Sequence, residues 1–99
     1  MERWWLVPIL VMWALPVHAA PSRAEMLVAP CFACHSNDDA IRGDIPRLDI
    51  EAERIRVKLE DFREDDARTT IMGRIARGYS DEEIALIADY LGSLREQGR

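Results

Sequence analysis

The chain is poor in cysteine and in strand-forming segments, and each shortage excludes a class of protein. Cysteine occurs only twice among 99 residues, so a structural zinc site built on these thiols would lack two of its four ligands. No run of β-branched residues is long enough to form the sheet that a thioredoxin-like redox dithiol requires. Internal repeats and low-complexity tracts are absent as well. These features favour a single all-α domain.

Positive charge is also scarce. The chain has 13 Lys and Arg against 18 Asp and Glu, which gives a net charge of −5. Residues 1–19 contain one Glu and one Arg, so their removal leaves the net charge at −5. Nucleic acids and anionic membranes select clustered Lys and Arg. We therefore expect neither of them as a partner.

The first 19 residues are predicted to be a cleaved secretory signal peptide. Arg3 precedes an apolar run over residues 4–15, and the small residues around Ala19 form a cleavage site. The run is too short for an ordinary membrane span and is interrupted by proline. An uncleaved anchor remains the alternative, but cleavage would leave no stable span. Export predicts a periplasmic protein whose single domain comprises residues 20–99.

A domain of this size needs stabilisation beyond its own hydrophobic core. Removal of 19 of the 99 residues leaves 80, and domains below roughly 70–80 residues rarely build a sufficient core from apolar side chains alone. A buried prosthetic group would supply the missing stabilisation.

The stretch 31–35 reads CFACH and suggests what that group is. Two cysteines three apart lie on one helical face, and a histidine follows the second. This spacing is the signature of c-type haem attachment. We therefore predict that Cys31 and Cys34 bind one haem c covalently through thioethers, and that His35 is the proximal ligand of its iron.

The sixth iron ligand can be predicted by elimination. After signal cleavage His35 is the one remaining histidine, and only Met26 and Met72 remain as methionines. Met26 precedes Cys31 by five residues on the proximal side, whereas Met72 is far along the chain in what we expect to be a glycine-flanked loop. Met72 is the predicted distal ligand, although space-filling in the core is the commoner use of methionine. A filled sixth position predicts electron transfer without catalysis.

Helical patterns cover most of the mature chain. Ser22 and Glu25 match a capping box that would open a helix over residues 22–34, with Pro30 kinking it or starting a new turn. Asp49 is expected to cap a second helix, ending near residue 63. Ser80 begins a clear capping box for a last helix that ends near residue 96.

These features together resemble a class I cytochrome c. The resemblance rests on CFACH, a Pro-x-Leu element at residues 46–48, a helix ending in LEDFR, a distal methionine and a final capped helix. More narrowly, residues 70–80, TIMGRIARGYS, are similar to the axial-methionine segment of the cytochrome subunits of flavocytochrome c sulfide dehydrogenases.

The resemblance implies a small class I cytochrome c fold, with three to five helices wrapped around one covalent haem. It also implies that the Pro46 carbonyl orients His35 by accepting a hydrogen bond from its ring. Ser36 departs from the glycine common after the motif, which puts the local backbone path in question.

The implied function is periplasmic electron transfer by a His/Met-ligated haem, with electrons accepted from a flavoprotein sulfide dehydrogenase subunit. The chain would not be catalytic by itself. One alternative is a free soluble carrier between other periplasmic redox proteins. Another is an open-site haem enzyme or gas sensor, for which the mature chain offers no distal histidine.

Overall fold

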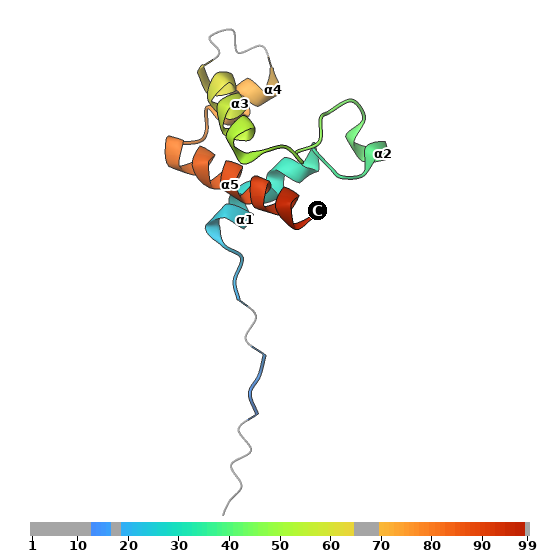
Figure 1. Ribbon diagram of the computed structural model, residues 1–99, viewed down its shortest axis with the longest axis vertical. Coiled ribbons are helices and arrows are strands. Elements are labelled where there is room, and N and C mark those ends of the chain that lie inside the picture. Colours follow the sequence, from blue (N-terminus) through green and yellow to red (C-terminus); the bar gives the residue numbers. More distant parts are fainter. Residues whose placement is uncertain (1–12, 17–18, 65–69, 99) are drawn as a thin grey trace, which may run out of the picture.

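The computed structural model describes residues 13–16, 19–64 and 70–98. Regular structure within these ranges is helical (Figure 1). The elements in order are α1 (Arg23–Val28), the 3-10 helix η2 (Ala29–Ala33), α2 (Asp39–Arg42), α3 (Ala52–Glu64), α4 (Ile71–Ala76) and α5 (Asp81–Gln97). The prediction of an all-α fold of three to five helices, consistent with a small cytochrome c, is therefore confirmed.

Most of the predicted signal segment, residues 1–12 and 17–18, lies outside the described residues. Residues 13–16 and Ala19 are exposed and belong to no helix. The described residues just ahead of α1, 19–22, extend away from the helices (Figure 1). None of the helices in the described ranges is long and apolar enough to cross a membrane.

The predicted first helix is divided into two. Ser22 caps α1, since its hydroxyl accepts a hydrogen bond from the Glu25 N–H at 3.2 Å. At Ala29 the chain changes to the tighter 3-10 helix η2, with Pro30 in its first turn. Proline lacks an N–H and clashes with a preceding helical carbonyl, so it starts a new turn more easily than it continues the old one.

α3 begins later than predicted. Its first i to i−4 hydrogen bond runs from the Ile55 N–H to the Glu51 carbonyl at 3.1 Å. Asp49 therefore precedes the capping position, and the prediction that it caps this helix is wrong. Its carboxylate instead pairs with Arg47, with Oδ2 lying 3.5 Å from Nε.

Residues 71–76 are helical rather than a loop, which corrects the expected surroundings of Met72. The Thr70 hydroxyl accepts a hydrogen bond from the Gly73 N–H at 3.1 Å and thereby caps α4. Gly73 is buried within this short helix, where a Cβ would lie 3.3 Å from the Thr70 hydroxyl. The glycine here permits close packing instead of breaking the helix.

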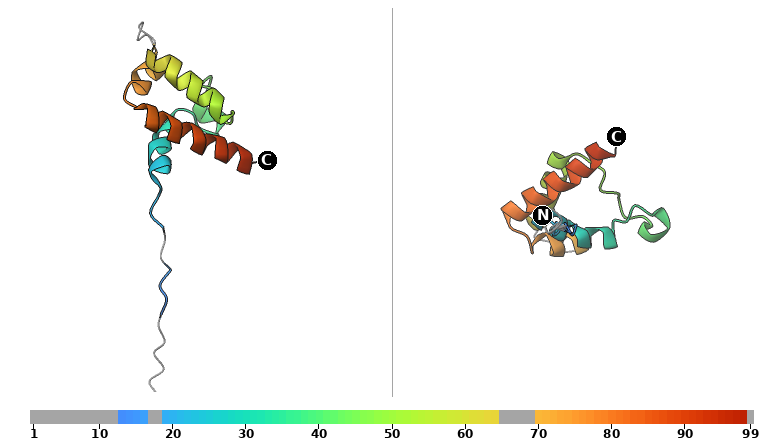
Figure 2. Two further views of the ribbon diagram at one scale, coloured as in Figure 1. Left: turned by 60° about the vertical axis from the view of Figure 1, so that its left-hand side comes forward. Right: turned by 90° about the horizontal axis from the view of Figure 1, so that it is seen from below.

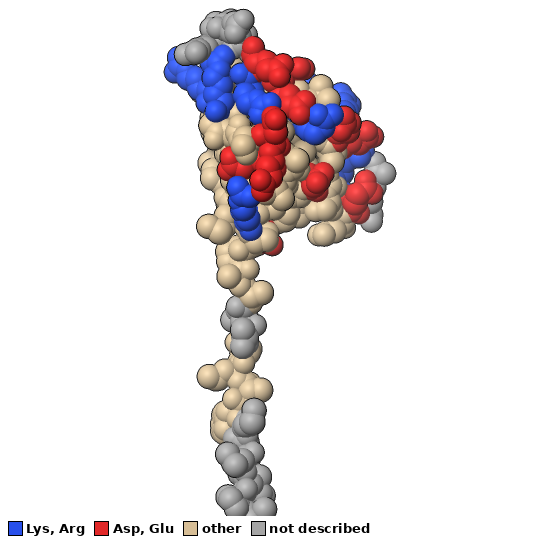
Figure 3. All heavy atoms as spheres, turned by 90° about the vertical axis from the view of Figure 1, so that its left-hand side faces the viewer, with Lys and Arg blue, Asp and Glu red and all other residues tan. Residues whose placement is uncertain are grey.

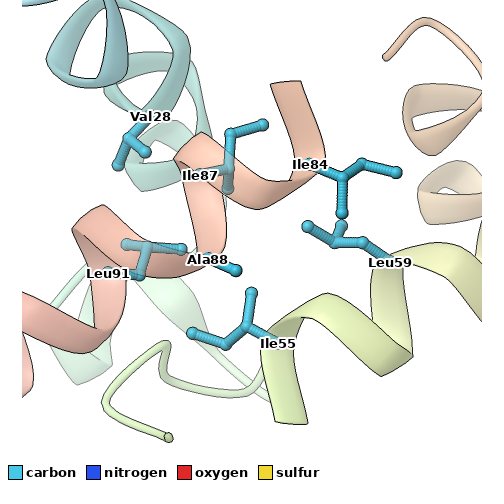
Figure 4. Packing of buried hydrophobic residues seen from close by; sticks show 7 residues of the cluster. All are labelled: Val28, Ile55, Leu59, Ile84, Ile87, Ala88 and Leu91. Carbon is cyan, nitrogen blue, oxygen red and sulfur yellow. The ribbon is translucent and has the colours of Figure 1, made fainter. Parts of the chain in front are cut away.

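The hydrophobic core forms around α5. Figure 4 shows Val28 of α1 on one side of α5, and Ile55 and Leu59 of α3 on the other. α5 itself contributes the buried side chains of Ile84, Ile87, Ala88 and Leu91. Ser80 and Glu83 form the predicted capping box at its start. α4 packs on α3, and α3 lies alongside α5 (Figure 2).

A short helix, α2, lies between the CFACH motif and Pro46. Asp38 caps it, since its carboxylate accepts a hydrogen bond from the Ala40 N–H at 3.0 Å. The helix ends at Gly43, which has φ 61° and ψ −127°. In Figures 1 and 2, α2 stands to one side of the layers formed by α1, α3 and α5.

Candidate functional site

The CFACH motif forms one tight turn at the end of η2. The carbonyl of Cys31 accepts hydrogen bonds from the N–H groups of Cys34, at 3.3 Å, and His35, at 2.9 Å. Side chains three apart in a 3-10 helix eclipse one another. This backbone therefore carries both thiols on the same side, as attachment to one flat ligand requires. Neither thiol is in a disulfide.

The electrostatics of the first cysteine differ from those of a redox dithiol. Burial raises the pKa of the Cys31 thiol, and a backbone hydrogen bond only partly opposes this effect. Reactive cysteines in redox dithiols have lowered pKa values instead, because the thiolate is the nucleophile. Cys31 is thus a neutral thiol at neutral pH.

Tyr79 lies close to this turn. Burial raises the pKa of its phenol, and so do the negative charges that Cys31 and Glu83 carry when they are ionised. Its ring also packs against the hydrophobic core. Tyr79 thus fills space at the edge of the core, and its phenol lies close enough to Cys31 for the two groups to interact electrostatically.

The geometry of His35 leaves one ring nitrogen for a ligand. Its Nδ1 lies 2.7 Å from the carbonyl oxygen of Pro46. A carbonyl can only accept, so Nδ1 carries the hydrogen and donates it. The lone pair on Nε2 then remains for a metal. Histidines that bind metals almost always donate their other N–H in this way.

Met72 belongs to a different part of the molecule. Its side chain is partly buried and packs against the edge of the core. α4 packs against α3, and these described helices bring α4 into no close backbone contact with η2. The structure thus brings His35 and Pro46 together and gathers the two cysteines, whereas Met72 lies on a separate helix and is not brought to them.

Apolar side chains are left exposed on the two segments that carry the predicted iron ligands. Ile41 and Ile45, in the segment between His35 and Pro46, are 69% and 38% exposed. On α4, Ile71 and Ile75 flank Met72 and are 72% and 42% exposed. A haem is large and mainly apolar, so it could cover exposed side chains of this kind. The residues present therefore fit a haem.

Other candidate sites are weaker. Within residues 13–16, 19–64 and 70–98, no group of three or more His, Cys, Asp or Glu side chains is arranged to hold a metal ion. The two thiols and His35 thus do not converge as zinc ligands would. An open depression on α3 is lined by Lys58, Asp61, Phe62 and Glu64. It contains none of the CFACH residues and has a mainly charged lining.

Sequence reasoning missed one residue beside the site. Arg42 donates a hydrogen bond to the carbonyl of Ile45, the residue before Pro46, at 2.7 Å. An arginine in a polar stretch looks like solvated surface, and no periodicity distinguishes it. The one available signal was its spacing of three from Asp39, which suits an ion pair on one helical turn.

The helical fold and the CFACH turn define a small cytochrome. Over 77 residues the chain is 40% identical to the cytochrome subunit of sulfide dehydrogenase from Chlorobaculum tepidum, and the alignment covers 77% of this chain and 70% of that protein. No family model and no solved structure matches the chain. The chain belongs to the family of the cytochrome subunit of sulfide dehydrogenase.

Membership of this family makes the chain an electron-transfer cytochrome and implies that it binds haem. The prediction that it is not catalytic by itself agrees with the role of an electron-transfer subunit.

Proposed function

We propose that the mature chain is a periplasmic c-type cytochrome that carries one covalent haem and accepts electrons from a flavoprotein subunit of sulfide dehydrogenase. The observation that carries the proposal is the 2.7 Å hydrogen bond from His35 Nδ1 to the Pro46 carbonyl. This bond fixes the tautomer and the ring orientation that an axial ligand needs. It occurs directly after two cysteines at the attachment spacing.

Each of the site residues has a role in this proposal. The thiols of Cys31 and Cys34 would form the two thioethers, and His35 would bind the iron through Nε2. The sulfur of Met72 would close the sixth position and keep dioxygen and peroxide from the metal. When bound, the haem supplies one-electron redox chemistry. Pro46 holds the histidine in place.

The proposed partner follows from the family. The relative from Chlorobaculum tepidum is named as a subunit of sulfide dehydrogenase, and a cytochrome subunit requires a partner that oxidises the substrate. Charge can steer such contacts. Figure 3 shows one face on which basic side chains gather at the upper corner beside a band of acidic ones. Arg74, on α4 two residues after Met72, is exposed.

Haem attachment can be tested directly. The full chain would be expressed in a bacterium that matures c-type cytochromes, and the periplasmic product measured by mass spectrometry after denaturation. We expect cleavage after Ala19 and the added mass of one haem. The Cys31→Ala/Cys34→Ala double variant is the matched control and should carry no covalent haem. A wild-type protein of unmodified mass would overturn the proposal.

The partner is tested by affinity purification of the tagged, haem-loaded protein from native periplasmic extract. Recovery of a stoichiometric flavoprotein that reduces the haem when sulfide is added would support the dehydrogenase role. Recovery of the cytochrome alone would indicate a free carrier between other redox proteins.

A further inference from the structure

Arg42, at the end of α2, has a mostly covered side chain. Only 14% of its side chain is exposed, although arginine is seldom buried unless it is paired. Its Nη2 forms an ion pair with Asp39 one turn earlier in α2. Its Nη1 donates a hydrogen bond to the Ile45 carbonyl at 2.7 Å. The guanidinium thus joins the short helix to the residue that precedes Pro46.

The backbone of the same residue makes a second connection. The Arg42 carbonyl accepts a hydrogen bond from the Ile45 N–H at 3.3 Å, which closes a four-residue turn. Gly43, the first central residue of this turn, has φ 61° and ψ −127°, as in the type II′ geometry that requires glycine. Arg42 therefore engages both polar groups of the Ile45 backbone.

Covalent geometry links the Ile45 backbone, which Arg42 holds, to the Pro46 carbonyl that accepts the His35 hydrogen bond. The Ile45 carbonyl and the Pro46 nitrogen belong to one planar peptide unit. The ring of Pro46 fixes the next torsion, φ, near −65°. Only ψ of Pro46 then separates the peptide that Arg42 holds from the carbonyl that accepts the His35 hydrogen.

One nitrogen of the guanidinium makes no hydrogen bond within the described residues. This atom, Arg42 Nε, is buried. The contacts that Arg42 does make are internal to the loop, which is consistent with bracing rather than ligand binding.

We propose that Arg42 is a positioning residue that holds the Pro46 carbonyl on His35 and thereby tunes the reduction potential of the bound haem. The inference rests on the proposed function. A hydrogen bond from Nδ1 raises the basicity of the imidazole, and a more basic ligand stabilises the ferric state. Loosening this hydrogen bond therefore raises the reduction potential.

The first test measures the reduction potential of the haem-loaded protein and its variants. For Arg42→Ala we expect the equilibrium constant for reduction to increase about ten-fold, which corresponds to about 59 mV for one electron. Arg42→Lys, which keeps the charge but not the planar fork, should show a smaller shift. Arg47→Ala is the control in the same loop, because its side chain is more exposed and its Nη1 lies 3.5 Å from the Asn37 carbonyl and 3.9 Å from Asp39 Oδ1, so that neither contact is with the Ile45 or the Pro46 carbonyl.

The second test measures how fast the Nδ1 proton of His35 exchanges with solvent, by NMR of the same loaded proteins. Exchange should be faster in Arg42→Ala than in wild type, and unchanged in Arg47→Ala. If Arg42→Ala does not fold, Asp39→Asn removes the ion pair that orients the guanidinium and should shift both readouts in the same direction.

Two results would overturn this inference and leave the proposed function standing. One is a folded Arg42 variant with the reduction potential and the Nδ1 exchange rate of wild type. The other is an Arg47→Ala variant that changes both quantities as much as Arg42→Ala does. A wild-type protein without covalent haem would instead overturn the proposed function, and this inference with it.

Discussion

Gly92 of α5 packs directly against Ala52, the first residue of α3. A Cβ placed on residue 92 would lie 2.7 Å from the Cβ of Ala52 and 3.2 Å from its Cα and N. These are backbone or near-backbone atoms, which cannot turn aside as the end of a long side chain can. The absence of a side chain at Gly92 therefore sets how closely the two longest helices meet.

Gly92→Ala should destabilise the protein although alanine is the better helix former by about 1 kcal/mol. The added methyl group must separate α3 from α5, and such overpacking costs about 1–3 kcal/mol. Urea unfolding followed by circular dichroism measures the change. Gly98→Ala is the control, because a Cβ there would meet nothing closer than 3.6 Å. Equal stability of the two variants would contradict the close contact.

The capping box of α5 predicts a specific dependence of stability on pH. The Ser80 backbone N–H donates to Glu83 Oε1 at 3.0 Å and, with the Ser80 side chain and then Arg23, lowers the pKa of this carboxyl. A lowered folded-state pKa means that the stabilisation is present above the unfolded value of about 4.3 and is lost as the pH falls through the folded value.

We therefore expect Glu83→Gln to be less stable than wild type at pH 7, and the difference to shrink as the pH falls below about 5, towards and past the usual carboxyl pKa. Thermal unfolding over a pH series provides the measurement. Glu82→Gln removes an equal charge from the same turn without touching the cap. If wild type remained more stable than Glu83→Gln by the same amount at low pH, the ionised Glu83 carboxylate would not be the source of the difference.

The helix ends were predictable where a local signal decided them. Ser22 and Ser80 cap their helices as the sequence indicates, because a capping hydroxyl acts within three residues. Asp49 shows the limit of such reasoning. Its carboxylate has a competing cation, Arg47, two residues away, and capping propensity alone does not say which partner it takes.

The site was predictable in its chemistry and only partly in its geometry. The spacing of Cys31, Cys34 and His35 defines one helical turn whatever the rest of the chain does. The helical setting of Met72 was not predicted, because two nearby glycines suggested a loop while the Thr70 cap favours a helix. The brace by Arg42 depends on a turn at Gly43 that no periodic pattern reveals.

Loss of the covalent haem should destabilise the domain. The Cys31→Ala/Cys34→Ala variant leaves Ile41, Ile45, Ile71 and Ile75 in water, where covering a large aliphatic side chain fully is worth about 1.5–3 kcal/mol. We expect a lower melting temperature than for the loaded protein and more binding of a hydrophobic dye. A Ser93→Ala protein, altered at an exposed position of α5, controls for substitution itself. Identical melting of the loaded protein and the double variant would show that these side chains do not contact the haem.

Substitution of Met72 distinguishes an electron carrier with a filled sixth position from a haem protein with an open site. In the loaded protein, Met72→Ala should free the sixth position, so that the ferrous form binds carbon monoxide rapidly while wild type does not. The reduction potential should also fall, because a methionine ligand raises it. Met26→Ala is the matched control, since Met26 is 64% exposed on α1 and its loss should change neither readout. Rapid binding of carbon monoxide by the wild type would instead favour a gas sensor or haem enzyme, and an effect confined to Met26→Ala would move the distal ligand to α1.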